Sequence, residues 1–213
     1  MEPLFLLFGG VLGFVFSVPL ISGVVWCVQI AINRGWLAGL SAGLGIALAQ
    51  TLWANLAAFL IFQLAPYSDR YNWAFRFLAA IILLSMSFRV FQIGKIESLA
   101  YKGSLVDANA IFRRTFIIAL AMPMRFLGYL ALLVAMSLHL RVQPIVNGFL
   151  LAIGVGAGSF LWWLCFVTLA ALFGKRVPEP ITIRSLNKLR FLGAAVLLGV
   201  MFIGTVPLVV SMK

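Results

Sequence analysis

The sequence predicts an all-α integral membrane protein with six transmembrane helices, arranged as two inverted three-helix repeats with broken helices at Pro19 and Pro123. Three observations lead to this fold class: an apolar composition, six continuous apolar runs, and a similarity between the two halves of the chain. Hydrophobic residues make up 64% of the 213 residues and charged residues 10%, whereas soluble domains are about 45–50% apolar and about 25% charged. A soluble enzyme, a nucleic-acid-binding domain and a disordered chain are therefore excluded.

The apolar runs are long and uninterrupted. A membrane-spanning helix needs about 20 apolar residues, whereas the strands of an outer-membrane barrel would alternate apolar and polar residues. The runs fall at about 4–32, 36–63, 73–92, 113–138, 144–173 and 189–210. We therefore expect six helical spans. Because no basic residue precedes the first run, we expect a retained helix rather than a cleaved signal peptide.

The basic residues predict the orientation of the spans. The chain has 16 Lys and Arg against 5 Asp and Glu, a net charge of +11. One side of the predicted membrane holds 11 of them: Arg34, Arg89, Lys95, Lys102, Arg113, Arg114, Lys175, Arg176, Arg184, Lys188 and Arg190. The other side holds Arg70, Arg76, Arg141 and Lys213. Because basic loops stay in the cytoplasm, we expect a multi-pass protein of a bacterial-type inner (plasma) membrane, with both termini outside the cytoplasm.

The two halves of the chain resemble each other. The matches are Arg76–Leu84 with Arg190–Leu198, Gly35, Gly43 and Gly45 with Gly148, Gly156 and Gly158, and Pro19 with Pro123. A three-span repeat contains an odd number of crossings, so its second copy is inverted in the membrane. We divide the single transmembrane domain, 1–213, into a first repeat at 1–92, a cytoplasmic connecting loop with an interfacial helix at 93–112, and a second repeat at 113–213.

Pro19 and Pro123 predict interrupted helices at matching places. A proline in a helix removes one backbone donor and frees a carbonyl, which is costly in lipid unless the segment lines a cavity or finds partners. Matched broken helices are typical of secondary transporters, whose half-helix ends face a substrate at the midplane. Ordinary proline kinks are the alternative interpretation.

Small residues recur in the second and fifth runs. The glycines concerned are Gly35, Gly39, Gly43, Gly154, Gly156 and Gly158. Small side chains let helix backbones approach closely in lipid. We interpret these positions as sites of helix packing rather than of chemistry.

Several motifs resemble the LysE/RhtB-type amino-acid exporter family along nearly the whole chain. They are Ser17-Val18-Pro19, Asn33-Arg34-Gly35, Ala38–Gly45, Phe112-Arg113-Arg114 with Pro123, and Arg184–Lys188 before the last apolar run. The resemblance implies a six-span inner-membrane exporter of amino acids or related small metabolites, which is dimeric and driven by an ion gradient.

The chain departs from the family pattern at three signature sites. Leu20-Ile21-Ser22 replaces the family's Pro-Gly-Pro, Ala49-Gln50 replaces Gly-Asp, and Met122-Pro123-Met124 replaces Asn-Pro-Lys. These departures favour a second hypothesis: a family relative that has lost transport and serves as a structural or assembly subunit of a larger membrane complex. The six tryptophans would then offer surface for partners or pigments.

Arg125 is the polar residue in the predicted spans that most needs an explanation. Every acidic residue lies at an end or in a loop (Glu2, Asp69, Glu97, Asp107, Glu179). An unpaired Arg in mid-membrane costs about 2.5–3.5 kcal/mol and is a candidate functional residue. Its guanidinium suits a carboxylate. Neutralisation by carbonyls freed at Pro19, or snorkelling to water, is the structural alternative.

We expect the substrate site to consist of Pro19, Ser22, Gln50, Pro123 and Arg125. The two prolines would break the helices, Arg125 would hold the substrate carboxylate, and Gln50 and Ser22 would contact the polar remainder. Gln50 could equally join helices by hydrogen bonds. No cofactor, nucleic-acid or catalytic motif is found, and mid-membrane carboxylates that would bind divalent cations are lacking. We expect membrane lipid, a small solute and a second copy or a larger complex as partners, and no enzymatic activity.

The orientation predicts how the loop at 93–112 responds to labelling. A cysteine placed at Ser98 should resist a membrane-impermeant thiol reagent in intact cells, because this stretch carries basic residues that keep it in the cytoplasm. Labelling should succeed after lysis. Modification in intact cells would reverse the predicted orientation.

Overall fold

The computed structural model describes residues 2–68, 72–92, 107–137, 145–174, 176 and 178–211, and all regular secondary structure within them is helical. The eight helices in this part of the chain are α1 (Glu2–Ser17), α2 (Ile21–Arg34), α3 (Trp36–Ser68), α4 (Asn72–Gln92), α5 (Ala108–Leu120), α6 (Pro123–Ser137), α7 (Ile145–Phe173) and α8 (Glu179–Ser211). The all-α part of the predicted fold class is confirmed for these residues.

Four helices are long and apolar enough to cross a membrane alone, and the count rises to six if each of two bent pairs is one span. The bent pairs are α1 with α2 and α5 with α6. The candidate span in α8 runs from Pro180 to Phe202, so the predicted start at residue 189 is too late. The fourth run was expected from residue 113, but its helix begins at Ala108. Most of the predicted loop at 93–112 lies outside the described residues.

The predicted helix breaks are present at both prolines. The α1 and α2 axes meet at 81°, and those of α5 and α6 at 61°. Pro19 cannot donate a backbone hydrogen bond, and the Leu20 N–H bonds the Ser17 carbonyl at 3.2 Å instead of continuing the α-helical pattern. Pro123 is the first residue of α6, a position where a missing N–H costs nothing.

The two breaks differ in their surroundings. Pro19 is buried, and a Cβ added to Gly193 of α8 would lie 2.9 Å from the Pro19 Cα. Pro123 is exposed. The first break is therefore covered by another helix, whereas the second lies at the surface of the chain.

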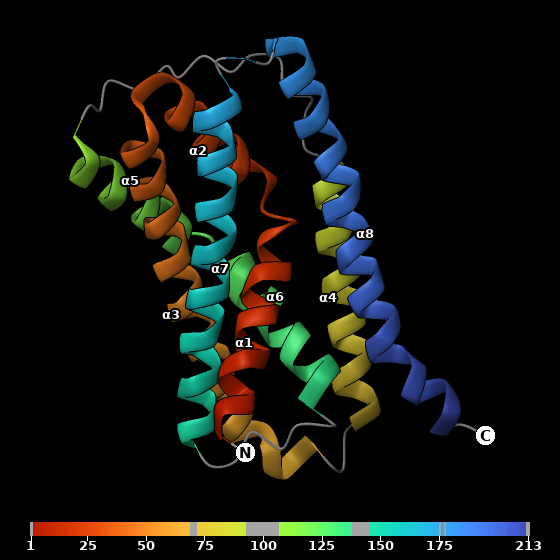
Figure 1. Ribbon diagram of the computed structural model, residues 1–213. Coiled ribbons are helices and arrows are strands. Elements are labelled where there is room, and N and C mark those ends of the chain that lie inside the picture. Colours follow the sequence, from red (N-terminus) through yellow and green to blue (C-terminus); the bar gives the residue numbers. More distant parts are fainter. Residues whose placement is uncertain are drawn as a thin grey trace.

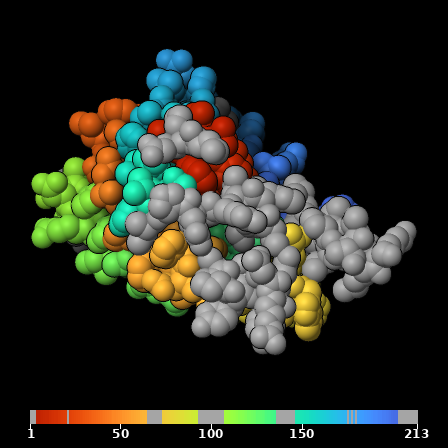
Figure 2. Space-filling view, turned by 90° about the horizontal axis from the view of Figure 1, so that it is seen from below, coloured from red at the N-terminus to blue at the C-terminus, as the bar shows by residue number. Residues whose placement is uncertain are grey.

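The arrangement of the helices is clear in Figures 1 and 2. In Figure 1, α1 begins and α8 ends at the same end of the molecule, as expected for an even number of crossings. Seen end-on in Figure 2, α1, α7 and α3 lie next to one another and α5 lies outside them. On the other side, α4 packs along α8.

Glycines bring α1 and α7 into backbone contact. A Cβ on Gly9 would collide with the Leu151 carbonyl, and one on Gly13 with the Val155 carbonyl. A Cβ on Gly158 would meet the carbonyl of Gly10 in the same way. Without a hydrophobic driving force in lipid, such close backbone approach and its dispersion contacts hold helices together.

The predicted packing role holds for most glycines of the second and fifth runs but not for Gly35. Gly43 faces the Trp163 side chain and Gly156 faces Thr51, so their small size is needed for contact between α3 and α7. Gly35 has a φ of 95° and open space around its Cβ position. Its role is the turn between α2 and α3, because a positive φ favours glycine.

The α1–α7 contact predicts a sharp difference between two glycine substitutions. Gly13→Ala should lower the free energy of unfolding by about 1–3 kcal/mol, the usual effect of overpacking. The matched control is Gly199→Ala, which meets no atom within 4 Å and should hold or gain stability, because alanine favours helix. Thermal unfolding of the purified protein in detergent measures both. Equal stability of Gly13→Ala and wild type would show that these backbones do not touch.

Candidate functional site

Arg125 lies inside the protein at the start of a half-helix. It is the third residue of α6, and its backbone N–H bonds the Met122 carbonyl at 3.1 Å across the break. Its side chain is only 5% exposed. The Arg125 side chain is therefore buried within the chain rather than exposed on its surface.

The electrostatics of this position favour an anion. The amino end of a helix carries a partial positive charge, so a guanidinium in the first turn is unfavourably placed unless a negative group lies beside it. The Nε and Nη1 atoms of Arg125 are buried and have no hydrogen-bond partner. A buried donor left unpaired costs about 1–3 kcal/mol, and more when it is charged. The site is thus arranged for a negatively charged acceptor that the described chain does not supply.

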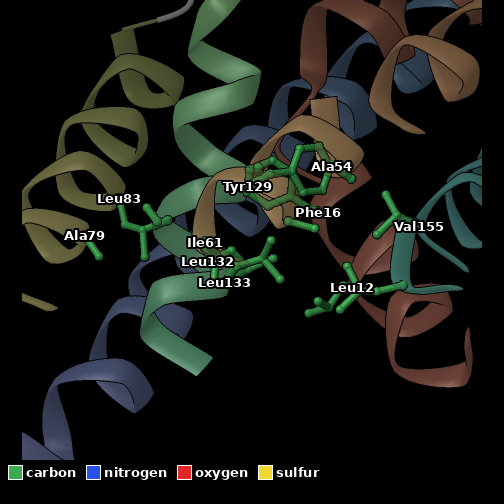
Figure 3. Close-up of a cluster of buried hydrophobic side chains, with 14 of the residues drawn as sticks. Leu12, Phe16, Ala54, Ile61, Ala79, Leu83, Tyr129, Leu132, Leu133 and Val155 are labelled. Carbon is green, nitrogen blue, oxygen red and sulfur yellow. The ribbon is translucent and has the colours of Figure 1, made fainter. Parts of the chain in front are cut away.

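Arg125 has one neighbour on its own helix and one on α2, and the first of these packs against α1. Arg125 lies within electrostatic range of Cys27 on α2 and Tyr129 on α6. The Tyr129 ring packs against Phe16 at the end of α1, with 4.6 Å between ring centroids. Figure 3 shows Tyr129 and Phe16 beside Ala54 of α3. The Tyr129 hydroxyl is buried and also lacks a partner, so it adds another free polar group near the guanidinium.

A second polar group lies where α1, α3 and α7 meet. The Ser17 Oγ is 3.1 Å from the Ser159 Oγ and 3.4 Å from the Gln50 Oε1. The Ser159 hydroxyl donates to the Gln50 Oε1, and the Trp163 Nε1–H donates to the Ser159 Oγ at 3.2 Å. Ser17, Gln50 and Ser159 are completely buried. We call these three residues and Trp163 the Gln50 cluster.

The two groups meet around the end of α1. Phe16 contacts Tyr129, and the next residue, Ser17, belongs to the Gln50 cluster. Gln50 also lies one helical turn before Ala54, which packs beside Tyr129. Both polar groups therefore lie near helix breaks. Ser17 of the Gln50 cluster is the last residue of α1, and Arg125 is the third residue of α6.

The five predicted site residues fall into two sets. Gln50 and Arg125 are buried and belong to the two polar groups, and Pro19 is buried in the first break. Ser22 and Pro123 are exposed. Pro123 begins α6 and so helps to position Arg125, which is the third residue of that helix. Ser22 makes none of the contacts described for the two polar groups.

Five further residues around these groups were not predicted: Ser17, Cys27, Tyr129, Ser159 and Trp163. Single Ser and Tyr residues in apolar helices are common and carry no spacing signal. Ser17 was the one with a usable clue, since it lies directly before the Pro19 break. Ser159 is 142 residues away from Ser17 in the chain, so only tertiary packing reveals their contact.

A separate apolar pocket of about 290 Å³ lies between α2, α7 and α8, with Ile32, Phe166 and Leu186 among its lining residues. None of the predicted site residues lines it. Within the described part of the chain, no three His, Cys, Asp or Glu side chains gather closely enough to hold a metal ion.

Comparisons with protein-family models, curated proteins and solved structures find no match to this chain. The resemblance to the LysE/RhtB-type exporters therefore stays a prediction.

The unpaired guanidinium predicts that its removal does not destabilise the protein. Arg125→Met keeps the length of the side chain and removes a buried charge, so the melting temperature in detergent should hold or rise. Arg113→Met, at an exposed position of α5, serves as the matched control and should change little. A clear loss of stability in Arg125→Met alone would mean that the guanidinium has structural partners inside the protein.

Proposed function

We propose that this protein is a secondary transporter that exports an amino acid or a similar small carboxylate-bearing metabolite by alternating access. The observation that carries the proposal is the buried Arg125 at the amino end of α6, with two unpartnered donors. A solute carboxylate would accept a charge-assisted hydrogen bond from one of these N–H groups and would also meet the positive end of the α6 dipole. It would supply the negative charge that the position favours.

The packing of the helices supports two inverted halves. A two-fold relation that exchanges α1 with α5, α2 with α6, α3 with α7 and α4 with α8 requires matching contacts. The α1–α7 contact has its counterpart in α5–α3, α2–α7 in α6–α3, and α2–α8 in α6–α4, while α3–α7 and α4–α8 map onto themselves. The α2–α3 and α6–α8 contacts have no comparable counterpart within the described residues, so the relation holds for part of the packing. Rocking of one half against the other about a fixed site is the usual basis of alternating access.

The proposed roles of the site residues follow from their positions. Arg125 binds the solute carboxylate, and Tyr129 contributes its free hydroxyl. Gln50 contacts the polar remainder, because its Nε2 is buried without an acceptor. Pro19 follows the end of α1 and Pro123 begins α6, so both prolines lie at the breaks that frame the solute. Ser22 completes the site only in a conformation that turns its exposed side chain inward.

The surroundings of the transporter are part of the proposal. The basic side of the chain faces the cytoplasm of a bacterial-type inner membrane, and both termini lie outside it. The exposed leucines of α3, namely Leu44, Leu48, Leu52 and Leu56, recur every fourth residue on one face. They form a continuous apolar stripe suited to lipid or to a second copy of the chain.

Efflux from preloaded cells tests the role of Arg125. With a panel of labelled amino acids, Arg125→Met should export at least about tenfold more slowly than wild type, since a hydrogen bond to a charged group contributes about 1.5–3 kcal/mol and 1.4 kcal/mol corresponds to a factor of ten. Arg125→Lys should recover only part of the rate, because a point charge does not reproduce the guanidinium fork. Arg113→Met should export normally.

Two results would count against this proposal. Export by Arg125→Met at the wild-type rate would make the residue structural. A wild-type protein that moves no member of the panel would favour the assembly-subunit hypothesis, which purification in mild detergent tests directly: stable partners and a native mass well above that of one or two chains would support it.

A further inference from the structure

The apolar pocket between α2, α7 and α8 lies near one end of the molecule. Its lining includes Ile32 near the end of α2, Phe173 at the end of α7 and Thr182 near the start of α8. These three helix ends lie in the upper part of Figure 1. The pocket is therefore close to the level where these helices leave the hydrocarbon, rather than at the midplane.

The pocket runs along the helices and is open to the outside. On α8 its lining residues recur at the spacing of one helix face and cover about 10 Å of the axis: Thr182, Ser185, Leu186 and Leu189. On α7, Leu169 and Phe173 line the pocket and are 52% and 50% exposed, so the pocket opens onto the outer surface of the helices. Its volume of about 290 Å³ is near the lower end of the range for ligand pockets. An apolar pocket of this form can hold part of one acyl chain.

Exposed basic side chains lie beside the same helix ends. Arg184 and Lys188 are exposed one helical turn apart on α8. Successive residues of a helix are about 100° apart, so Lys188 is about 60° around α8 from Ser185 of the pocket lining. Arg176 is exposed in the turn that follows α7. The sequence from 174 to 190 contains five Lys and Arg against one acidic residue, so the surface beside the pocket favours a negatively charged ligand.

We propose that this pocket binds one acyl chain of an anionic phospholipid whose phosphate lies beside Arg184 and Lys188. Long basic side chains extend their apolar stems along the hydrocarbon and keep their charged heads at the level of the lipid headgroups. Basic pockets between transmembrane helices are known places for anionic headgroups. The hydroxyls of Thr182 and Ser185 are the polar side-chain groups of the lining, and a hydroxyl can donate to an ester or phosphate oxygen of the lipid.

Charge also argues for lipid over a second copy of the chain. A second copy in the same orientation would bring its own basic residues to this end, and like charges across an interface are unfavourable. In the proposed orientation this end meets the cytoplasmic leaflet, whose surface is negatively charged. The inference does not depend on the proposed transport function, because none of the proposed solute-binding residues lines the pocket.

Lipid binding to the purified, delipidated full-length protein in a neutral detergent tests the site. The probes are dioleoyl phosphatidylglycerol, dioleoyl phosphatidylcholine, and glycerol 3-phosphate, which carries the phosphate without an acyl chain. Phosphatidylglycerol should raise the melting temperature to a plateau, because a ligand of the folded state stabilises it, and native mass spectrometry should show one lipid retained per chain. Phosphatidylcholine should bind at least about tenfold more weakly, since its headgroup has no net charge for the basic residues. Glycerol 3-phosphate should have no effect.

Two variants that fill the pocket test the acyl-chain part of the site. Ala170→Phe places a ring in the pocket from α7, and Ser185→Phe does so from α8; both should lose saturable binding of phosphatidylglycerol. The matched control is Ala157→Phe, at an exposed position of α7 that does not line the pocket, and it should bind as wild type. Elution as a single folded species in gel filtration excludes misfolding, and each filling variant checks the other.

A charge variant tests the headgroup part. Lys188→Gln should weaken the binding of phosphatidylglycerol about fivefold, the usual contribution of one basic residue at an anionic lipid surface, and should leave phosphatidylcholine binding unchanged. Arg113→Gln, which removes an exposed charge from α5, is the matched control and should bind both lipids as wild type.

The proposal is overturned if the wild-type protein binds the two phospholipids equally well, which would mean that the basic residues select no headgroup. It is also overturned if both filling variants bind phosphatidylglycerol as wild type does. A native mass of two chains that falls to one in both filling variants, with lipid binding unchanged, would assign the pocket to a second copy of the chain instead.

Discussion

In the interior of a membrane a polar group finds no water, and this one constraint organises the whole structure. The backbone meets it by forming helices throughout the described part of the chain. Where Pro19 and Pro123 interrupt the helices, new partners are needed: the Leu20 N–H takes the Ser17 carbonyl, and the Arg125 N–H takes that of Met122. Some side-chain atoms remain without a hydrogen-bond partner in the described chain, among them Nε and Nη1 of Arg125.

The same constraint explains how much the sequence alone could predict. Long apolar runs and prolines are local signals, so the spans and both helix breaks were predictable from composition and from the missing proline donor. The start of α8 was not, because Arg184, Lys188 and Arg190 made its first turns look like a loop. At 33 residues this helix is about 50 Å long, well beyond the roughly 30 Å of the hydrocarbon core, so its basic first part can lie at the interface.

A residue of the candidate site could be predicted from the sequence only where its side chain alone is energetically unfavourable inside a membrane. Arg125 stood out because a charge inside a span demands an explanation, and its side chain is buried. Ser17 and Ser159 did not stand out, since a serine can satisfy itself within its own helix, as Ser41 does. Their importance arises from a contact between helices that are distant in the chain, made possible by glycines that let α1 and α7 touch. For Gly35 the prediction of a packing role was wrong. It lies within a pattern of small residues, but its positive φ serves the turn between α2 and α3.

The two breaks place opposite half-helix ends in one region, and their polarity decides what each can bind. The amino end of α6 presents the unpaired donors of Arg125, whereas the serines and Gln50 near the end of α1 bond one another. A guanidinium at the amino end of a helix has the same sign as the helix dipole there, which is unfavourable if nothing is bound. A purely structural bundle would gain stability by exchanging it for an apolar residue. A side chain that makes the empty state less favourable makes an anion-bound state more so, which is the property that the proposed function requires of Arg125.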